Sequence, residues 1–230
     1  MKKKKKKKKL AKKYLYRRIA CVVLLLGICS LIFSGIGRIN KRKIESMASV
    51  KKSNDKILKQ KEVLDLYNDL NVIETNFVWH DKLEKGNKPE KIVLHHTGSK
   101  SASVEWIHDG HVEKGWAGIG YHYFIKKDGK IYKGRDEDVI GAHVKRNNEN
   151  SLGISLEGDF QIEKPTQEQN ESMLNLLKYL YIKYDIKDLK GHRELWETFC
   201  PGENLKVASI KKELDLLLEE YKNKENISER

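Results

Sequence analysis

GHRELWETFCPG, residues 191–202, combines an imidazole at His192 with a thiol at Cys200 in a segment too rich in helix breakers and bulky polar residues to form one regular helix. Far upstream, the apolar run 92–94 ends in His95 and His96. This run is typical of a buried strand, and it would deliver imidazoles at its C-terminal end. The two segments together offer two nitrogen ligands and one sulfur ligand.

Such a ligand set suits zinc, which accepts mixed imidazole and thiolate ligands in a tetrahedral site. Three protein ligands leave the fourth position for water, and zinc lowers the pKa of that water to about 7. Spacing alone favours a plainer interpretation, because a lone Cys commonly packs as a small buried hydrophobe and a strand-end His commonly forms hydrogen bonds.

Eight short motifs follow one another along the chain: His95-His96-Thr97, Gly120-Tyr121-His122-Tyr123-Phe124-Ile125, Asp128-Gly129, Gly134-Arg135, Gly141-Ala142-His143, Ser151-Leu152-Gly153-Ile154, Gly191-His192-Arg193 and Cys200-Pro201-Gly202. In this order they resemble the zinc-dependent N-acetylmuramoyl-L-alanine amidases of the type shared by phage lysozyme-like amidases and peptidoglycan recognition proteins. The resemblance covers residues 91–205. It implies hydrolysis of the amide bond between N-acetylmuramic acid and L-alanine in peptidoglycan, with one Zn²⁺ per domain.

The net charge of +13 could indicate a nucleic-acid-binding protein, but its distribution argues against one. Residues 1–52 hold 18 Lys and Arg and one acidic residue, whereas residues 53–230 hold 28 basic and 32 acidic residues. The positive excess therefore belongs to the N-terminal segment, and no nucleic-acid partner is expected.

Residues 19–37, IACVVLLLGICSLIFSGIG, carry no charge and approach the ~20 residues that cross a bilayer as a helix. The basic tail at 1–18 should stay in the cytoplasm, which sends the remainder of the chain outside. A cleaved signal peptide is the alternative, but its apolar region would be shorter and no A-x-A-like site precedes Arg38. We expect a single-pass membrane protein with an extracellular or periplasmic domain.

Residues 38–71 are rich in Lys and Glu, lack Gly and Pro, and have imperfect helical spacing of apolar residues. They predict a helical or flexible stalk. The amidase-like domain is expected at 72–230, with its motifs in 91–205. We expect this catalytic domain to be monomeric.

Strand-like and helix-like segments alternate within this domain. Strands are expected at 91–95, 121–126, 130–133 and 152–156, with a hairpin at Asp128-Gly129. Ser103 is a candidate N-cap for a helix ending near Gly115, and Thr166 with Gln169 forms a capping box for a second, long helix. A third helix is expected at 205–221. The order predicts an α/β fold with a mixed central sheet flanked by helices.

Cysteine usage is consistent with metal binding. Cys21 and Cys29 lie in the predicted membrane span, which leaves Cys200 without a disulfide partner in the exported domain. Outside the cell a spare thiol is paired with another chain, oxidisable, or occupied. The resemblance implies that zinc occupies it.

The resemblance also assigns roles to individual residues. His95, His192 and Cys200 match the zinc ligands, Tyr121 and Thr198 match residues that stabilise the reacting carbonyl, and His143 matches a histidine of the substrate groove. One branch of the family uses a Glu as general base, where this chain has Ser155. Glu157 is a weak substitute, expected to be solvent-facing or hydrogen-bonded.

Three further residues are candidate substrate contacts with plainer alternatives. His96 neighbours a ligand on a strand and should point away from the metal, into the core or behind the ligands. Arg135 could bind a peptide carboxylate or form a structural salt bridge. Trp116 could stack on a sugar, although single tryptophans usually pack. His108 and His111, at i and i+3, are expected on a helix surface.

The sequence is compatible with two functions: a membrane-anchored, zinc-dependent peptidoglycan amidase, and a non-catalytic peptidoglycan-binding module of the same fold. The binding module should have lost its cysteine ligand. Because Cys200 is present, the sequence favours the hydrolase.

Overall fold

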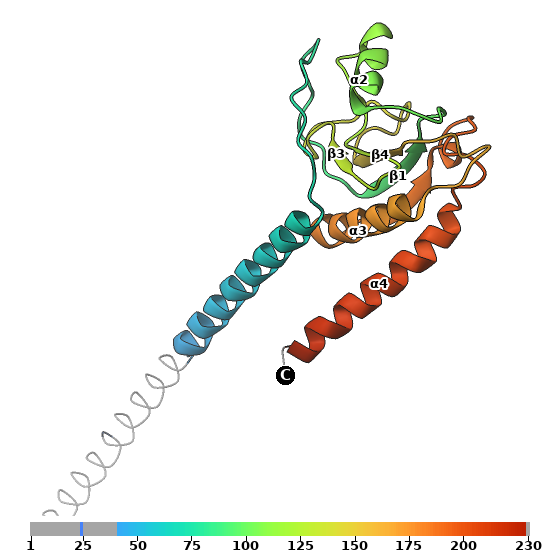
Figure 1. The fold of residues 1–230 in the computed structure, drawn as a ribbon. Helices are drawn as coiled ribbons and strands as arrows, with labels where there is room; N and C mark the ends of the chain where they lie inside the picture. The colour runs from blue at the N-terminus through green and yellow to red at the C-terminus, as the bar shows by residue number, and fades with distance from the viewer. Residues whose placement is uncertain (1–23, 25–40, 229–230) are drawn as a thin grey trace, which may run out of the picture. The chain divides into compact units, whose positions relative to one another are not determined.

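The computed structural model describes residue 24 and residues 41–228, with side chains up to 224 (Figure 1). The chain forms two units, Met1–Gln60 and Lys61–Arg230. In the first unit, residues 41–60 are helical and their side chains are exposed. The basic tail and nearly all of the predicted membrane span at 19–37 lie outside the described residues. Within the described part, no helix is long and apolar enough to cross a bilayer.

The second unit is built on a five-stranded mixed sheet of order β3-β2-β4-β1-β5. Its strands are β1 Lys91–His96, β2 Tyr123–Ile125, β3 Ile131–Lys133, β4 Ser151–Leu156 and β5 Asp188–Gly191. Only the β2–β3 pair is antiparallel, and it is joined at the predicted Asp128-Gly129 turn. The other pairs are parallel, so their carboxyl ends meet at one edge, where ligand sites commonly form. The mixed sheet flanked by helices confirms the predicted fold class.

Three helices pack on this sheet: α2 Val104–Glu113, α3 Gln167–Tyr184 and α4 Val207–Ser228. Ser103 caps α2, its hydroxyl accepting the Trp106 amide at 3.1 Å. Thr166 and Gln169 form the predicted capping box of α3, with both reciprocal bonds present. The last helix extends further than expected, to Ser228.

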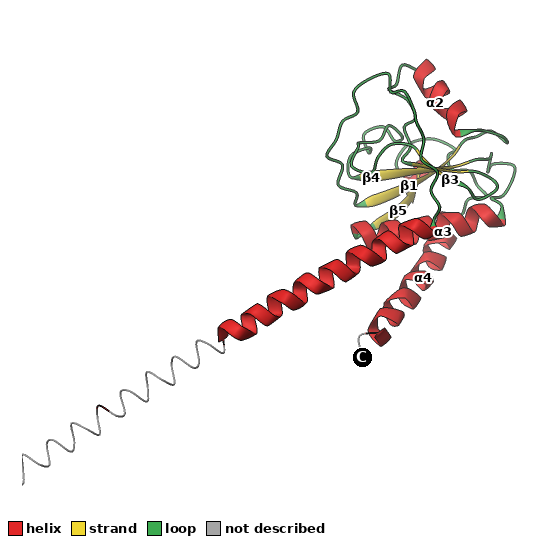
Figure 2. Cartoon of the chain, turned by 60° about the vertical axis from the view of Figure 1, so that its left-hand side comes forward, coloured by secondary structure: helices red, strands yellow, loops and turns green. Residues whose placement is uncertain are grey.

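The sheet separates two cores (Figure 2). Helix α2 covers one face, and α3 and α4 cover the other. Ile92 and Leu94 of β1 face α3 and α4, together with alternate residues of β4. Because strand side chains alternate, His95 points to the α2 face, as do Ser151, Gly153 and Ser155 of β4. Polar residues thus gather on the α2 face, while the opposite face is apolar.

The compact unit begins before the domain expected from sequence. Val63, Leu66, Tyr67 and Leu70 are half-buried and pack against the core beside α3. Tyr67 lies 5.3 Å from Tyr179 between ring centroids and donates a hydrogen bond to Glu74 at 2.9 Å. The helical residues 61–69 therefore belong to the folded unit.

Candidate metal centre

Strand register brings the first two candidate ligands together. His95 is the penultimate residue of β1 and is fully buried. Leu94 pairs with Gly191 of the parallel strand β5, and His192 follows Gly191 directly. The two imidazoles therefore lie side by side, with ring centroids 4.7 Å apart.

The third candidate ligand comes from the loop after β5. The Arg193 amide donates to the Cys200 carbonyl at 2.8 Å, which folds this loop back on itself. Arg193 also donates to the Phe199 carbonyl at 2.6 Å and pairs with Glu203. Gly202 has φ +98° and lies against Phe160, where a Cβ would come within 2.5 Å of the Phe160 carbonyl carbon. Only glycine fits that position without displacing the backbone.

These contacts place the Cys200 thiol next to the imidazoles of His95 and His192. Its Sγ lies 3.6 Å from Nδ1 of His95 and 3.4 Å from the amide nitrogen of His96. One ligand atom from each of His95, His192 and Cys200 lies within 4.8 Å of the others. Two imidazole nitrogens and one sulfur at this spacing fit zinc.

The electrostatics of the site favour a cation. Burial, together with the neighbouring imidazoles, lowers the pKa of His95 well below its usual value, and burial lowers that of His192. Burial raises the pKa of the Cys200 thiol to about 12, despite the His96 amide and Arg193 nearby. Both imidazoles therefore keep free lone pairs at neutral pH. The thiol becomes a thiolate only when a cation such as zinc compensates its charge.

Tyr121 and Thr198 border the three ligands. The Tyr121 ring centroid is 5.0 Å from that of His95, and burial and the nearby Cys200 sulfur raise the pKa of its hydroxyl. The Thr198 hydroxyl accepts the Cys200 amide at 3.2 Å, so its proton remains available to another acceptor. The structure thus supplies two neutral hydroxyl donors beside the candidate metal site.

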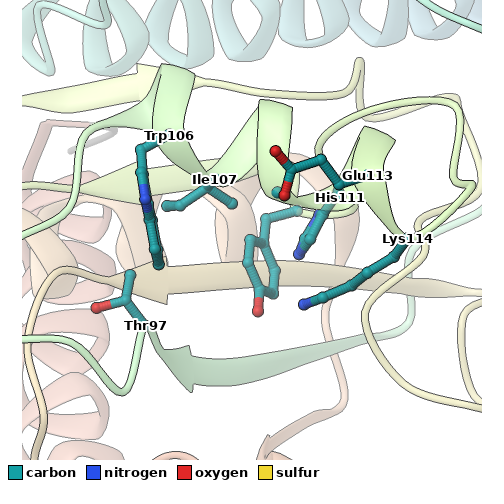
Figure 3. A pocket seen from close by; sticks show the side chains of 8 residues that line it. Thr97, Trp106, Ile107, His111, Glu113 and Lys114 are labelled. Atoms are coloured by element: carbon teal, nitrogen blue, oxygen red, sulfur yellow. The ribbon is translucent and has the colours of Figure 1, made fainter.

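Two hollows open at this site. The first, of about 300 Å³, runs along α2, and Figure 3 shows Trp106, His111 and Lys114 bounding it with Thr97. Tyr121 lines the same hollow. The second, of about 410 Å³, is lined by Trp116, Ala142, His143, Val144, Lys145, Asn148, His192 and Trp196. Each hollow therefore includes a residue of the site, and Trp116 lies in the second, half-exposed.

His143 contacts a ligand directly. Its Nδ1 lies 3.0 Å from Nε2 of His95, and its Nε2 lies 3.3 Å from the Ser151 hydroxyl. The side chain is buried, and both ring nitrogens have protein partners. His143 therefore lies behind a candidate ligand and also lines the second hollow, which leaves the substrate-groove role implied by the resemblance a prediction.

His96 and Arg135 are engaged by the protein itself. His96 accepts the Phe160 amide on Nδ1 at 3.1 Å, and Asp159 lies 3.9 Å from the same nitrogen. Arg135 is buried and donates to the carbonyls of Ile119 and Ile140 at 2.8 and 2.7 Å. Among the described residues no carboxylate forms an ion pair with Arg135, so the structural salt bridge is not present there, and the contact with a peptide carboxylate stays a prediction.

Glu157 is hydrogen-bonded and not solvent-facing. Its two carboxylate oxygens accept the amides of Ala102 at 2.9 Å and Lys127 at 3.0 Å. Ser155 is also buried, and its hydroxyl interacts with that of Tyr121, which lowers the Tyr121 pKa against the larger effect of burial. The structure therefore gives Glu157 a scaffolding role.

The prediction that His108 and His111 lie on a helix surface is wrong. Both are buried: the Phe77 ring stacks on that of His108 with centroids 4.1 Å apart, and the Trp116 ring centroid lies 4.6 Å from that of His111. His111 accepts the amide of Gly120 at 3.0 Å, and its ring lies 5.6 Å from that of Tyr121. The sequence showed the two histidines at i and i+3 but did not predict that His111 would lie beside Tyr121.

Residues 85–203 match the model of a family described as N-acetylmuramoyl-L-alanine amidase. The endolysin of Escherichia phage T7 is 37% identical over 121 residues, which cover 50% of this chain and 80% of that protein. A solved structure of the endolysin N-acetylmuramoyl-L-alanine amidase LysCS from Clostridium intestinale URNW has 40% identity and a TM-score of 0.62, covering 63% of this chain and 95% of its own. A Drosophila PGRP-LB variant in complex with tracheal cytotoxin has 30% identity and a TM-score of 0.55, covering 60% and 92%.

Proposed function

Since the chain belongs to the N-acetylmuramoyl-L-alanine amidase family, we propose that it is a zinc-dependent, membrane-anchored hydrolase that cleaves the bond between N-acetylmuramic acid and L-alanine in peptidoglycan. The observation that carries the zinc dependence is the convergence of His95, His192 and Cys200 within 4.8 Å. A non-catalytic relative would have no need of a complete ligand set.

His95, His192 and Cys200 would hold the metal. Zinc bound there would acidify a water molecule and polarise the scissile carbonyl. The chain contributes a neutral ligand pair, supplied by the buried imidazoles, and one sulfur that is charged only in the presence of the cation. This arrangement limits the net charge of the occupied site.

Tyr121 and Thr198 would act on the carbonyl oxygen as charge develops on it. The raised pKa of Tyr121 keeps its hydroxyl protonated at neutral pH, so it serves as a hydrogen-bond donor and not as a base. The Thr198 hydroxyl already accepts the Cys200 amide, which leaves its proton directed elsewhere. Fixed donors of this kind usually supply the largest single contribution to such catalysis.

The two hollows suit the two parts of the substrate. The α2 hollow carries Glu113 and Lys114, whose charges match the amino and carboxylate groups of a stem peptide. The other hollow carries Trp116 and Trp196, whose faces suit a sugar ring. We therefore assign the peptide to the first and the glycan to the second.

The anchor and the location remain part of the proposal. The uncharged residues 19–37 and the preceding basic tail favour one membrane crossing with a cytoplasmic N-terminus. The catalytic domain would then act as a monomer outside the cytoplasm, where peptidoglycan lies. The acidic balance of residues 53–230 argues against a nucleic-acid partner.

A direct experiment incubates the full-length chain, in detergent and loaded with zinc, with purified muropeptides. Mass spectrometry should detect stem peptides with a free L-alanine amino group, together with intact glycan. Binding of muropeptides without any release of peptide from the zinc-loaded protein would contradict the hydrolase and indicate a recognition module. Chelation by a strong zinc ligand should stop the release.

A further inference from the structure

Buried hydrogen bonds connect the candidate ligand His95, through His143, to Ser151. His95 Nε2 lies 3.0 Å from His143 Nδ1, and His143 Nε2 lies 3.3 Å from the Ser151 hydroxyl. The Ser151 hydroxyl oxygen lies 2.8 Å from two backbone carbonyls, those of Asn147 and Asn148. All three side chains are buried.

The direction of these hydrogen bonds follows from Ser151, the last residue of the series. Carbonyl oxygens only accept, so the single hydroxyl proton of Ser151 is directed to Asn147 or Asn148. Ser151 can then only accept from His143, which places a proton on Nε2 of His143. A neutral imidazole has one donor and one acceptor nitrogen, so Nδ1 of His143 accepts from Nε2 of His95.

This direction leaves the other nitrogen of His95 unprotonated. Nδ1 of His95 faces Cys200, at 3.6 Å from its Sγ. The free lone pair is therefore on the nitrogen that borders the other candidate ligands. Histidine ligands usually donate their second ring N–H to a partner that fixes the tautomer and the ring orientation, and here the partner is another histidine.

The fold holds the His143 ring closely. A Cβ at Gly153 would lie 2.5 Å from Cγ of His143, and a Cβ at Gly141 would lie 2.5 Å from its Cδ2. Two glycines thus make room for one imidazole. The backbone is fixed as well, because the amides of His143 and Val144 both donate to Oδ1 of Asn148 at 2.8 Å.

We propose that His143 is a positioning residue, which orients His95 for metal binding through a one-way series of hydrogen bonds ending at Ser151. The inference rests on the proposed zinc site and adds to it a determinant of zinc affinity. A substrate contact through the ring nitrogens of His143 is incompatible with this arrangement, since both nitrogens are used.

Zinc affinity of the full-length chain, measured by competition with a chromophoric chelator, tests the inference without any assay of activity. His143→Leu should weaken zinc binding by about 10- to 100-fold, because the acceptor for His95 is lost. His143→Gln has a similar volume and keeps an acceptor oxygen and a donor NH₂, so it should recover most of this affinity. Equal losses in the two variants, or wild-type affinity in His143→Leu, would overturn the proposal.

His108→Leu is the matched control, since His108 is also buried with both ring nitrogens bonded, to the Val78 carbonyl and the Ile119 amide. His108→Leu should lower thermal stability and leave zinc affinity unchanged. A loss of zinc affinity equal to that of His143→Leu would show that the His143 effect is general destabilisation, and would overturn the proposal. If His143→Leu does not fold, Ser151→Ala replaces it and should weaken zinc binding several-fold. Unchanged affinity in Ser151→Ala would then reject the hydrogen-bond series.

Nitrogen NMR of the wild-type imidazoles supplies an independent readout. The proton of His143 is expected on Nε2, and a proton on Nδ1 would contradict the inference. Failure of the wild-type chain to bind zinc would instead overturn the proposed function itself. The two failures are therefore distinguishable.

Discussion

The imidazoles of His95 and His192 lie with ring centroids 4.7 Å apart, at the ends of two parallel strands that pair directly. Leu94 is level with Gly191, so the residue that follows each of them falls at the same edge of the sheet. A shift of one residue in either strand would turn one imidazole to the opposite face. The apolar residues that fix this register are therefore also determinants of the candidate metal site.

Tyr121→Phe tests the proposed donor to the carbonyl oxygen. Removal of the hydroxyl should lower kcat by about 10²- to 10³-fold, as for other donors to a developing oxyanion. Zinc content and thermal stability should change little, because the hydroxyl is not a ligand. Steady-state kinetics on muropeptides, with metal analysis of the same samples, measures both, and an unchanged kcat would exclude the proposed role.

Glu157→Gln separates scaffolding from general-base catalysis. The carboxylate accepts two backbone amides, from Ala102 and Lys127, and an amide side chain cannot accept both with oxygen. We expect a loss of about 1–3 kcal/mol in the free energy of unfolding, measured by urea denaturation. The kcat of the folded variant should equal that of the wild type; a large fall in kcat without loss of stability would instead identify Glu157 as the base.

Gly153→Ala tests the close packing around His143. The added methyl group would lie 2.5 Å from Cγ of His143, and overpacking of this kind costs about 1–3 kcal/mol. The variant should have a lower Tm and weaker zinc binding. Gly110→Ala is the control, since nothing lies within 4 Å of its Cβ in helix α2, and it should gain about 0.5–1 kcal/mol. A Gly153→Ala protein with wild-type Tm and zinc affinity would show that the ring is loosely held.

Buried histidines should make the zinc-free protein less stable in acid. Burial is the main reason that the pKa values of His111 and His122 fall to about 4. Unfolded histidine titrates near 6.5, so between these values the unfolded chain binds more protons and the free energy of unfolding decreases as pH falls. Each residue contributes on the order of 3 kcal/mol, fully present above pH ~6.5.

Urea denaturation of the chelated protein at several pH values measures this dependence. His111→Gln and His122→Gln should each show a shallower loss of stability between neutral pH and pH ~4 than the wild type, because one titrating group is removed. Slopes equal to that of the wild type would contradict the low pKa values.

Local sequence signals predicted much of this fold. The β1 run, the Asp128-Gly129 turn and the Thr166 capping box each depend on neighbouring residues, and each appears in the structure. The three zinc-ligand candidates were found because their motifs resemble a known family. Strand register brings His95 and His192 together, and the loop after β5 adds Cys200.

Contacts between distant segments were beyond sequence reasoning. The bond between His95 and His143 depends on how the loop before β4 returns to β1, which no local pattern encodes. His108 and His111 were misplaced because Phe77 on His108 and Trp116 on His111 cover a helix face that would otherwise be exposed.

Zinc-dependent hydrolysis is tested by comparing the full-length wild-type chain with Cys200→Ser and Cys29→Ser. Zinc content is measured for each protein, together with release of L-alanine-terminated peptide from muropeptides. Cys29 provides a matched substitution, because it lies in the predicted anchor and outside the ligand set. We expect one zinc per chain and peptide release for the wild type and Cys29→Ser, and loss of both for Cys200→Ser. Peptide release by a Cys200→Ser protein that holds no zinc would exclude a zinc-dependent amidase.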